Sequence, residues 1–135
     1  MGITPLGLTW LGDLSRLFKM KKYTLQTVVE TPEFIKQSSY FFDEDSKEAF
    51  IKFIAQNPLE GDLIPGTGGA RKIRWQSEAG GGKRSGARII YYYHNENIPI
   101  FLFTAYKKNQ KENITATEKK LLKKIINLIV DSYER

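Results

Sequence analysis

Three short runs of β-forming residues lie close together in the chain and constrain its fold more than any other feature. They span residues 71–75, 87–94 and 98–106 and are rich in Ile, Phe and Tyr. Only Asn95-Glu96-Asn97 separates the second run from the third, which is the length of a hairpin turn. The pattern predicts three consecutive antiparallel strands.

The residues before these runs predict one more strand and two helices. Residues 23–30 contain several β-branched residues, and the Thr31-Pro32 pair that follows is a helix-start signal with Thr31 as the N-cap. A second start signal at residues 43–45 precedes an amphipathic helix that is expected to end near Asn57-Pro58. Residues 58–70 are rich in Gly and Pro, so we expect no regular element there.

The last part of the chain predicts a third helix. Either Thr115 or Thr117 opens it, and apolar residues at helical spacing, including Leu122 and Ile126, form a continuous stripe while the lysines face water. The predicted order is strand, two helices, three antiparallel strands and helix. The fold class is therefore α+β, with a single sheet packed on helices.

Composition limits the chemistry that is available. A chain of 135 residues with 41% hydrophobic residues is the size of one domain with its own core. The chain has no cysteine and a single histidine, His94, which excludes disulfides, thiol catalysis and a multi-histidine metal centre within one chain. We therefore expect no metal and no cofactor. No apolar run approaches the ~20 residues that span a bilayer, so we expect no membrane partner.

The first residues are interpreted as separate from the main domain. Residues 1–19 lack a basic start before their apolar part, so we read no signal peptide and expect a cytoplasmic protein. We interpret 1–19 as an N-terminal extension and 20–135 as the domain. The alternative is that Leu11, Leu14 and Phe18, which recur at helical spacing, pack on the domain as an amphipathic helix.

Positive charge is concentrated on and between the predicted strands. From Arg71 to Arg88 there are six basic residues against the single acid Glu78, a net charge of +5 out of +6 for the whole chain. A surface so strongly and locally positive is typical of a protein that binds a polyphosphate, most simply nucleic acid.

Strand alternation predicts which side chains act together. In the last strand Leu102, Thr104 and Tyr106 are expected to share one face, while Phe101 and Phe103 pack on the helices from the other.

This alternation leaves Arg88 and Tyr106 on an open face of the sheet. Lys72 and Arg74 join them, since they alternate around Ile73, which is expected to be buried. We predict that the four polar side chains converge on one concave patch.

Further RNA-binding residues are expected around this patch. They are Arg71, the loop residues Lys83 and Arg84, and Tyr92, whose ring is suited to stacking on a base. The loop sequence GGGKRSG is not a phosphate-binding P-loop, because Arg84 occupies the position of the Ser or Thr that follows the lysine in that motif.

The central block resembles a known family. The sequences GTGGARKIRW, GKRSGARIIYYY and IFLFTAYKKNQKEN are similar to the HigB branch of the RelE superfamily of bacterial toxins, and the resemblance covers roughly residues 23–130 in element order. It implies a RelE-like domain that cleaves mRNA in the ribosomal A site, in contact with ribosomal RNA. It also implies a cognate antitoxin protein that holds the nuclease inactive.

Site residues follow from the same resemblance. The basic pair on the second strand falls on Lys72 and Arg74, the strand arginine on Arg88, the residue that closes the last strand on Tyr106, and the basic residue beyond it on Lys108. A tyrosine that the family carries near the start of the last helix is absent from NQKENITAT, and Tyr106 is positioned to replace it.

RNA cleavage without a metal needs three things: neutralisation of the phosphate, a base for the 2′-hydroxyl and an acid for the departing 5′-oxygen. Arg88 suits the first role, Tyr106 or Lys72 the second, and Arg74 or Lys108 the third. Two other functions fit the same positive surface. One is a non-catalytic RNA- or ribosome-binding module, and the other is an adaptor for an acidic protein.

Overall fold

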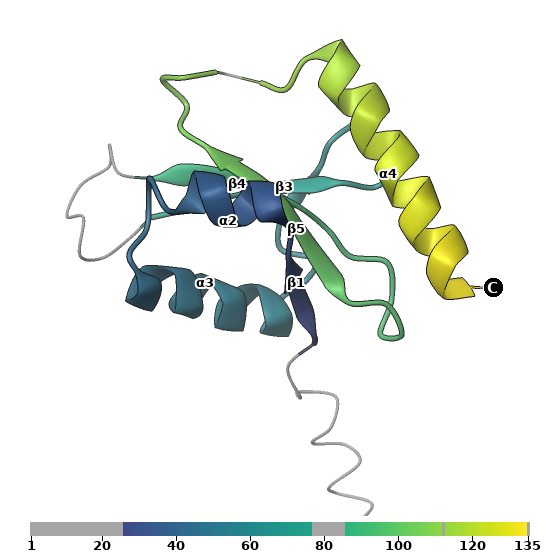
Figure 1. Cartoon of the computed structure of the whole chain (residues 1–135), viewed down its shortest axis with the longest axis horizontal. Helices are drawn as coiled ribbons and strands as arrows, with labels where there is room; N and C mark the ends of the chain where they lie inside the picture. Colours follow the sequence, from purple (N-terminus) through teal and green to yellow (C-terminus); the bar gives the residue numbers. More distant parts are fainter. Residues whose placement is uncertain (1–25, 77–85, 112, 135) are drawn as a thin grey trace, which may run out of the picture.

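The fold is built from five strands and three helices within the part of the chain that the structure describes. The structure is a computed structural model and describes residues 26–76, 86–111 and 113–134 (Figure 1). The elements are β1 (Val28–Glu30), α2 (Pro32–Ser38), α3 (Glu44–Gln56), β2 (Asp62–Leu63), β3 (Arg71–Trp75), β4 (Ala87–Tyr92), β5 (Ile100–Tyr106) and α4 (Ala116–Glu134). The interpretation of residues 1–19 as an extension falls outside the described residues.

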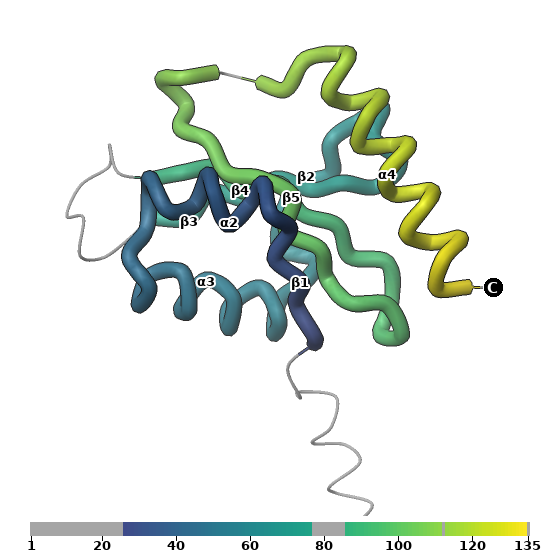
Figure 2. Tube along the Cα trace, viewed as in Figure 1, coloured from purple at the N-terminus to yellow at the C-terminus, as the bar shows by residue number. Residues whose placement is uncertain are grey.

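All five strands form one sheet with helices on both faces. The strand order is β1-β5-β4-β3-β2, with β1 parallel to β5 and the other neighbours antiparallel. Helices α2 and α3 lie on one side of the sheet and α4 on the other (Figures 1 and 2). The predicted α+β class, the single sheet and the three consecutive antiparallel strands β3, β4 and β5 are confirmed.

Each face of the sheet has its own hydrophobic core. Between the sheet and the helices α2 and α3, the buried residues are Phe34, Phe42, Phe50, Ile54, Ala87, Ile89, Tyr91, Ile100, Leu102 and Ala105. Between the sheet and α4, they are Ile64, Ala70, Ile90, Tyr92, Phe103, Tyr106, Ile114, Leu122 and Ile126. Because β4 contributes alternate residues to the two cores, it is buried on both faces.

The predicted faces of β5 are wrong in one respect, because this strand contains a β-bulge. Tyr91 pairs with Leu102 but Ile90 pairs with Thr104, so Phe103 is an extra residue on β5. An extra residue reverses the alternation beyond it. Leu102 therefore lies on the α2/α3 face, whereas Tyr106 lies on the α4 face together with Phe103.

Side-chain caps explain where the helices begin. The Thr31 hydroxyl accepts a hydrogen bond from the Phe34 amide at 3.2 Å, and the Asp43 carboxylate accepts one from the Ser46 amide at 2.7 Å. Thr115, and not Thr117, caps α4. The three starts agree with the predicted signals, and the alternative left open for α4 is thereby resolved.

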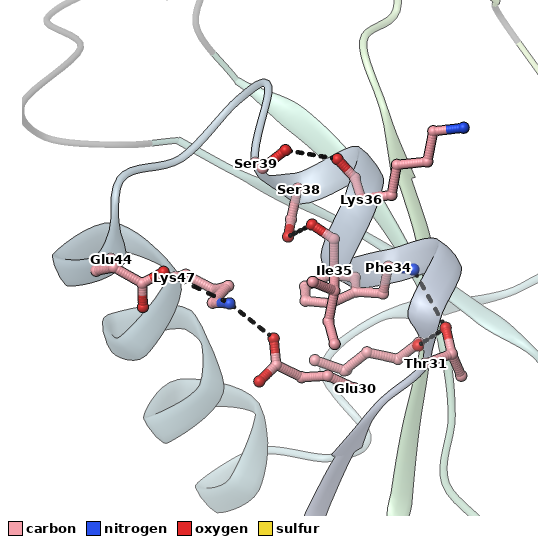
Figure 3. Close-up of polar contacts among 10 residues, drawn as sticks. Glu30, Thr31, Phe34, Ile35, Lys36, Ser38, Ser39, Glu44 and Lys47 are labelled. Carbon is pink, nitrogen blue, oxygen red and sulfur yellow. Dashed lines mark hydrogen bonds and ion pairs between the residues drawn. The ribbon is translucent and has the colours of Figure 1, made fainter.

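An ion pair ties β1 to α3. Figure 3 shows Glu30 at the end of β1 reaching Lys47 of α3, with 3.0 Å between Glu30 Oε1 and Lys47 Nζ. Both side chains are largely covered, with exposed fractions of 28% and 18%. This shielding from solvent lets the pair hold the edge strand against the helix.

Residues 58–70, predicted to lack regular structure, contain the short edge strand β2. Asp62 and Leu63 pair with the start of β3, so the expectation for this segment was wrong. A turn then connects β2 to β3. In this turn Gly66 and Gly68 have φ of 82° and 79°, and the buried Thr67 hydroxyl donates to Ile64 O at 2.7 Å. Glycine is suited to these two positions, because it adopts positive φ without the steric cost that other residues have.

We expect replacement of Thr31 by Ala to destabilise the protein by about 1–2 kcal/mol, because the residue makes two kinds of bond. Its hydroxyl caps α2 by accepting from the Phe34 amide (Figure 3). It also donates to Leu102 O of β5 at 2.8 Å. Urea unfolding followed by circular dichroism measures the loss. Thr31→Ser keeps the hydroxyl and serves as the control; an equal loss in both variants would show that the methyl group, rather than the bonds, matters.

Candidate functional site

Three of the predicted site residues form a row across adjacent strands. Arg74 of β3 pairs with Arg88 of β4, and Arg88 pairs in turn with Tyr106 of β5. Neighbouring strands are ~4.8 Å apart, so the row spans roughly 10 Å. Lys72 pairs with Ile90 and therefore lies on the same face, two residues along β3 from Arg74. The structure thus brings together Lys72, Arg74, Arg88 and Tyr106, which we call the cationic row.

The cationic row concentrates positive charge at one place on the sheet. Arg74 and Arg88 are directly opposite each other on neighbouring strands. Gly86 gives the Arg74 side chain room, because a Cβ atom there would lie 3.2 Å from Arg74 Nε. Two guanidinium groups at paired strand positions create a local positive potential, so the arrangement is suited to binding an anion such as a phosphate.

Tyr106 is the least exposed member of the cationic row. Its exposed fraction is 7%, because it packs in the core under α4. Burial raises the pKa of the Tyr106 phenol; Arg88 lowers this pKa and Glu118 raises it further. The phenol is therefore protonated at neutral pH.

The face on which the cationic row lies is only partly open. Helix α4 covers the Ile90, Tyr92 and Phe103 end of it, so the expectation of a wholly open face was wrong. Lys72 and Arg88 are half-buried and Arg74 is exposed. The end of the face that carries the arginines therefore keeps part of its surface accessible.

Lys108 lies apart from the sheet. It is exposed in the turn that follows β5, two residues beyond Tyr106. Its side chain is long and mobile enough to reach toward a phosphate on the row, but the structure does not hold it there.

Two of the predicted RNA-binding residues have structural partners instead. The Arg71 guanidinium donates to Gly61 O at 2.7 Å and to Leu59 O at 3.3 Å, so it fixes the connection before β2. The Tyr92 ring is buried under α4 and its hydroxyl bonds to His94 Nδ1 at 2.8 Å. The Tyr92 ring offers no face to a base in this conformation, and we leave both residues out of the RNA-binding surface. Lys83 and Arg84 lie outside the described residues.

Sequence reasoning missed two residues beside the cationic row. Lys111 Nζ lies 5.7 Å from the centre of the Tyr106 ring and forms an ion pair with Glu118 of α4. The signal that could have found Glu118 is the spacing Thr115-x-x-Glu118, which is a capping box at the start of a helix.

Other classes of site find little support in the described ranges. Residues 26–76, 86–111 and 113–134 contain no group of three or more His, Asp or Glu side chains placed to hold a metal ion. None of the helices in these ranges is long and apolar enough to cross a membrane.

Two comparisons with known proteins give matches. A solved structure of a mutant of the E. coli toxin RelE in the free state is similar to this chain, with a TM-score of 0.48 and 15% sequence identity. The match covers 73% of this chain and 96% of that one. The family model described as the RelE toxin of the RelE/RelB toxin–antitoxin system matches residues 35–134, which include every described member of the cationic row. The chain therefore belongs to the RelE family of toxins from toxin–antitoxin systems.

Proposed function

We propose that this protein is a ribosome-dependent mRNA endonuclease that acts as the toxin of a toxin–antitoxin pair. The observation that supports this most is the row of Arg74, Arg88 and Tyr106 in register across three strands, with Lys72 beside it. Family membership supports the role of toxin. The row supplies positive charge and a phenol at spacings suited to one phosphodiester and its neighbours.

The cleavage that we propose is metal-independent. The RNA 2′-oxygen attacks the adjacent phosphorus, the bond from phosphorus to the 5′-oxygen breaks, and the products are a 2′,3′-cyclic phosphate and a new 5′-hydroxyl. Negative charge grows on the non-bridging oxygens during this step. Arg88, at the centre of the cationic row, is placed to bind these oxygens, and Lys72 and Arg74 add to the positive field.

Proton transfers complete the reaction. The 2′-hydroxyl must lose a proton and the 5′-oxygen must gain one. Burial raises the pKa of Tyr106, so its protonated phenol is proposed as a hydrogen-bond donor to the phosphate in the resting site. Tyr106 and Lys72 remain the two proposed bases. Arg74 and Lys108 remain the proposed proton donors to the 5′-oxygen.

The same proposal includes the partners. The mRNA is bound in the ribosomal A site beside ribosomal RNA, where Lys83 and Arg84 contact phosphates, and the protein acts in the cytoplasm. A cognate antitoxin keeps it inactive by covering the cationic row with acidic or amphipathic segments. The motifs GTGGARKIRW and GKRSGARIIYYY support placement in the HigB-like branch of the family.

Mapping of mRNA 5′ ends after brief expression tests the proposal. We expect new 5′-hydroxyl ends within translated regions, which disappear when translation is blocked by removal of the start codon of a reporter mRNA. If growth stops without new ends, and the purified protein binds programmed ribosomes without cleaving mRNA, a non-catalytic ribosome-binding module replaces the nuclease.

We expect removal of residues 1–19 to leave melting temperature and toxicity unchanged, if the domain is 20–135 as we propose. The described core begins at β1 and uses residues from Val28 onward. Thermal unfolding of the full chain and of a chain that starts at Met20 measures the difference. A drop of several degrees would show instead that Leu11, Leu14 and Phe18 pack on the domain.

A further inference from the structure

The segment between β5 and α4 places a lysine over the least exposed residue of the cationic row. Lys111 Nζ lies 5.7 Å from the centre of the Tyr106 ring, within the range of a cation–π contact. The turn before it is internally bonded, because the Gln110 amide donates to Lys107 O at 3.0 Å and the Gln110 side chain accepts from the Lys107 amide at 3.2 Å. Lys111 therefore leaves this turn from a defined position.

Glu118 of α4 holds the same lysine. One carboxylate oxygen, Oε2, forms an ion pair with Lys111 Nζ. The other, Oε1, accepts from the Thr115 amide at 2.8 Å, while the Thr115 hydroxyl accepts from the Glu118 amide at 3.1 Å. The hydrogen bond from Lys111, followed by that from the Thr115 amide, lowers the pKa of Glu118, so this carboxylate is charged at neutral pH.

The cap of α4 does not require the lysine. A capping box consists of the two bonds between Thr115 and Glu118, and both are made without Lys111. The second carboxylate oxygen is thus free to fix a side chain that reaches back to β5. The ion pair is partly exposed, with exposed fractions of 33% and 41%, and exposed pairs stabilise a fold little. The Lys111–Glu118 pair differs from an ordinary surface ion pair in its position beside Tyr106.

We propose that Lys111 and Glu118 are positioning residues for Tyr106: Glu118 holds the Lys111 ammonium group against the Tyr106 ring, and Lys111 in turn fixes the phenol beside Arg88. This inference rests on the proposed function, since it gives the pair a purpose in the cleavage reaction. In this proposal the Tyr106 hydroxyl contacts the phosphate, whereas Lys111 and Glu118 act only through Tyr106.

The pair also balances charge around the phenol. The charged groups that face Tyr106 are Arg88 from β4, Glu118 from α4 and Lys111 from the connection. We expect removal of Lys111 to raise the pKa of Tyr106, because a cation 5.7 Å from the ring is lost and the Glu118 carboxylate is left uncompensated. Removal of the carboxylate lowers it, because Glu118 acts to raise this pKa. Removal of Lys111 and removal of the Glu118 charge should therefore shift the Tyr106 pKa in opposite directions. Loss of packing alone would shift this pKa in the same direction in both variants.

The test compares Lys111→Met, Glu118→Gln and the double variant. The Tyr106 ionisation is followed by NMR of protein labelled at the tyrosine ring, with Tyr106→Phe to assign the resonance. We expect an upward shift for Lys111→Met, a downward shift for Glu118→Gln, and a near-parental value for the double variant. On programmed ribosomes we expect kcat for Lys111→Met to fall about 10-fold with KM within about twofold, because a misplaced group affects the chemical step more than binding.

Two further variants complete the design. Lys107→Met is the matched control, because Lys107 Nζ lies 5.7 Å from the Phe41 ring and not over Tyr106; it should change neither the Tyr106 resonance nor kcat. Lys111→Arg keeps the charge and should restore most of kcat.

Three outcomes would overturn the inference: shifts of the Tyr106 pKa in the same direction, shifts no larger than those of Lys107→Met, or failure of Lys111→Arg to restore kcat. A parent protein that does not cleave mRNA overturns the proposed function instead. The NMR titration uses the isolated protein, so it decides the positioning of Tyr106 in either case.

Discussion

Replacement of Arg88 by Ala lowers the rate of mRNA cleavage on programmed ribosomes by about 100-fold or more and abolishes growth arrest, on the expectation that Arg88 binds the phosphate in the transition state. Arg88 occupies the middle of the cationic row, with Arg74 on one side and Tyr106 on the other. It is half-buried and belongs to neither hydrophobic core, so its loss creates no cavity. The fold should therefore persist.

Two further variants separate the geometry of Arg88 from its charge. Arg88→Lys keeps the charge but loses the planar pair of donors, and we expect an intermediate rate. Lys52→Ala, which removes an exposed charge on α3, is the control for a change in net charge.

Thermal unfolding accompanies the kinetic measurements. If Arg88→Ala is as toxic as the parent at equal expression and equal melting temperature, Arg88 has no catalytic role. If its toxicity falls together with its melting temperature, the loss of activity reflects the fold and the assignment fails as well.

The largest effect on stability is expected at Gly61, just before β2. Gly61→Ala should destabilise the protein by roughly 3 kcal/mol, because an added methyl group overpacks the site. Its Cβ would lie 2.7 Å from Tyr91 Cε1 and from the Tyr91 hydroxyl, and 2.9 Å from the backbone oxygen of Lys72. A strand carbonyl and a fully buried ring cannot both move away, so the melting temperature should fall by about 10 °C.

The Tyr91 hydroxyl explains why the chain approaches so closely. It accepts from the Gly61 amide at 2.8 Å and donates to Pro58 O at 2.8 Å, so it joins β4 to the connection after α3. Tyr91→Phe should cost about 1–3 kcal/mol, because the buried Gly61 amide and the partly buried Pro58 carbonyl both lose their partner. The loss of unfolding free energy in the double variant Gly61→Ala/Tyr91→Phe should be smaller than the sum of the two single losses, because both substitutions disturb the same contact. Full additivity in urea unfolding would contradict the assigned clash.

Local signals in the sequence determined much of the secondary structure. β3 spans Arg71–Trp75 as predicted, and Thr31 and Asp43 cap the two helices that their positions indicate. These features depend on residues within a few positions of one another: a side-chain oxygen and an amide three residues away, or a pair of strands joined by a short turn. Such short-range interactions can be recognised from the order of residues in the sequence.

The cationic row was also largely predictable. Alternation around Ile73 places Lys72 and Arg74 on one face, and the observed register confirms that they share it with Arg88. What alternation could not show is which face α4 covers. The apolar residues of β4 alternate between two cores, and a strand that is buried on both faces gives no polar side by which to distinguish them.

The bulge at Phe103 belongs to the features that only the tertiary structure decided. One extra residue on β5 moves Tyr106 to the α4 face, and the amino-acid pattern of a strand does not reveal where its partner skips a residue. The contacts of Lys111 with Tyr106 and Glu118, and of Tyr91 with Gly61, likewise join residues from separate elements. The sequence by itself determined which residues form strands, helices and a positive patch, because those properties are local. The tertiary structure alone decided which phenol meets which arginine, because that pairing depends on strand register and on the packing of α4.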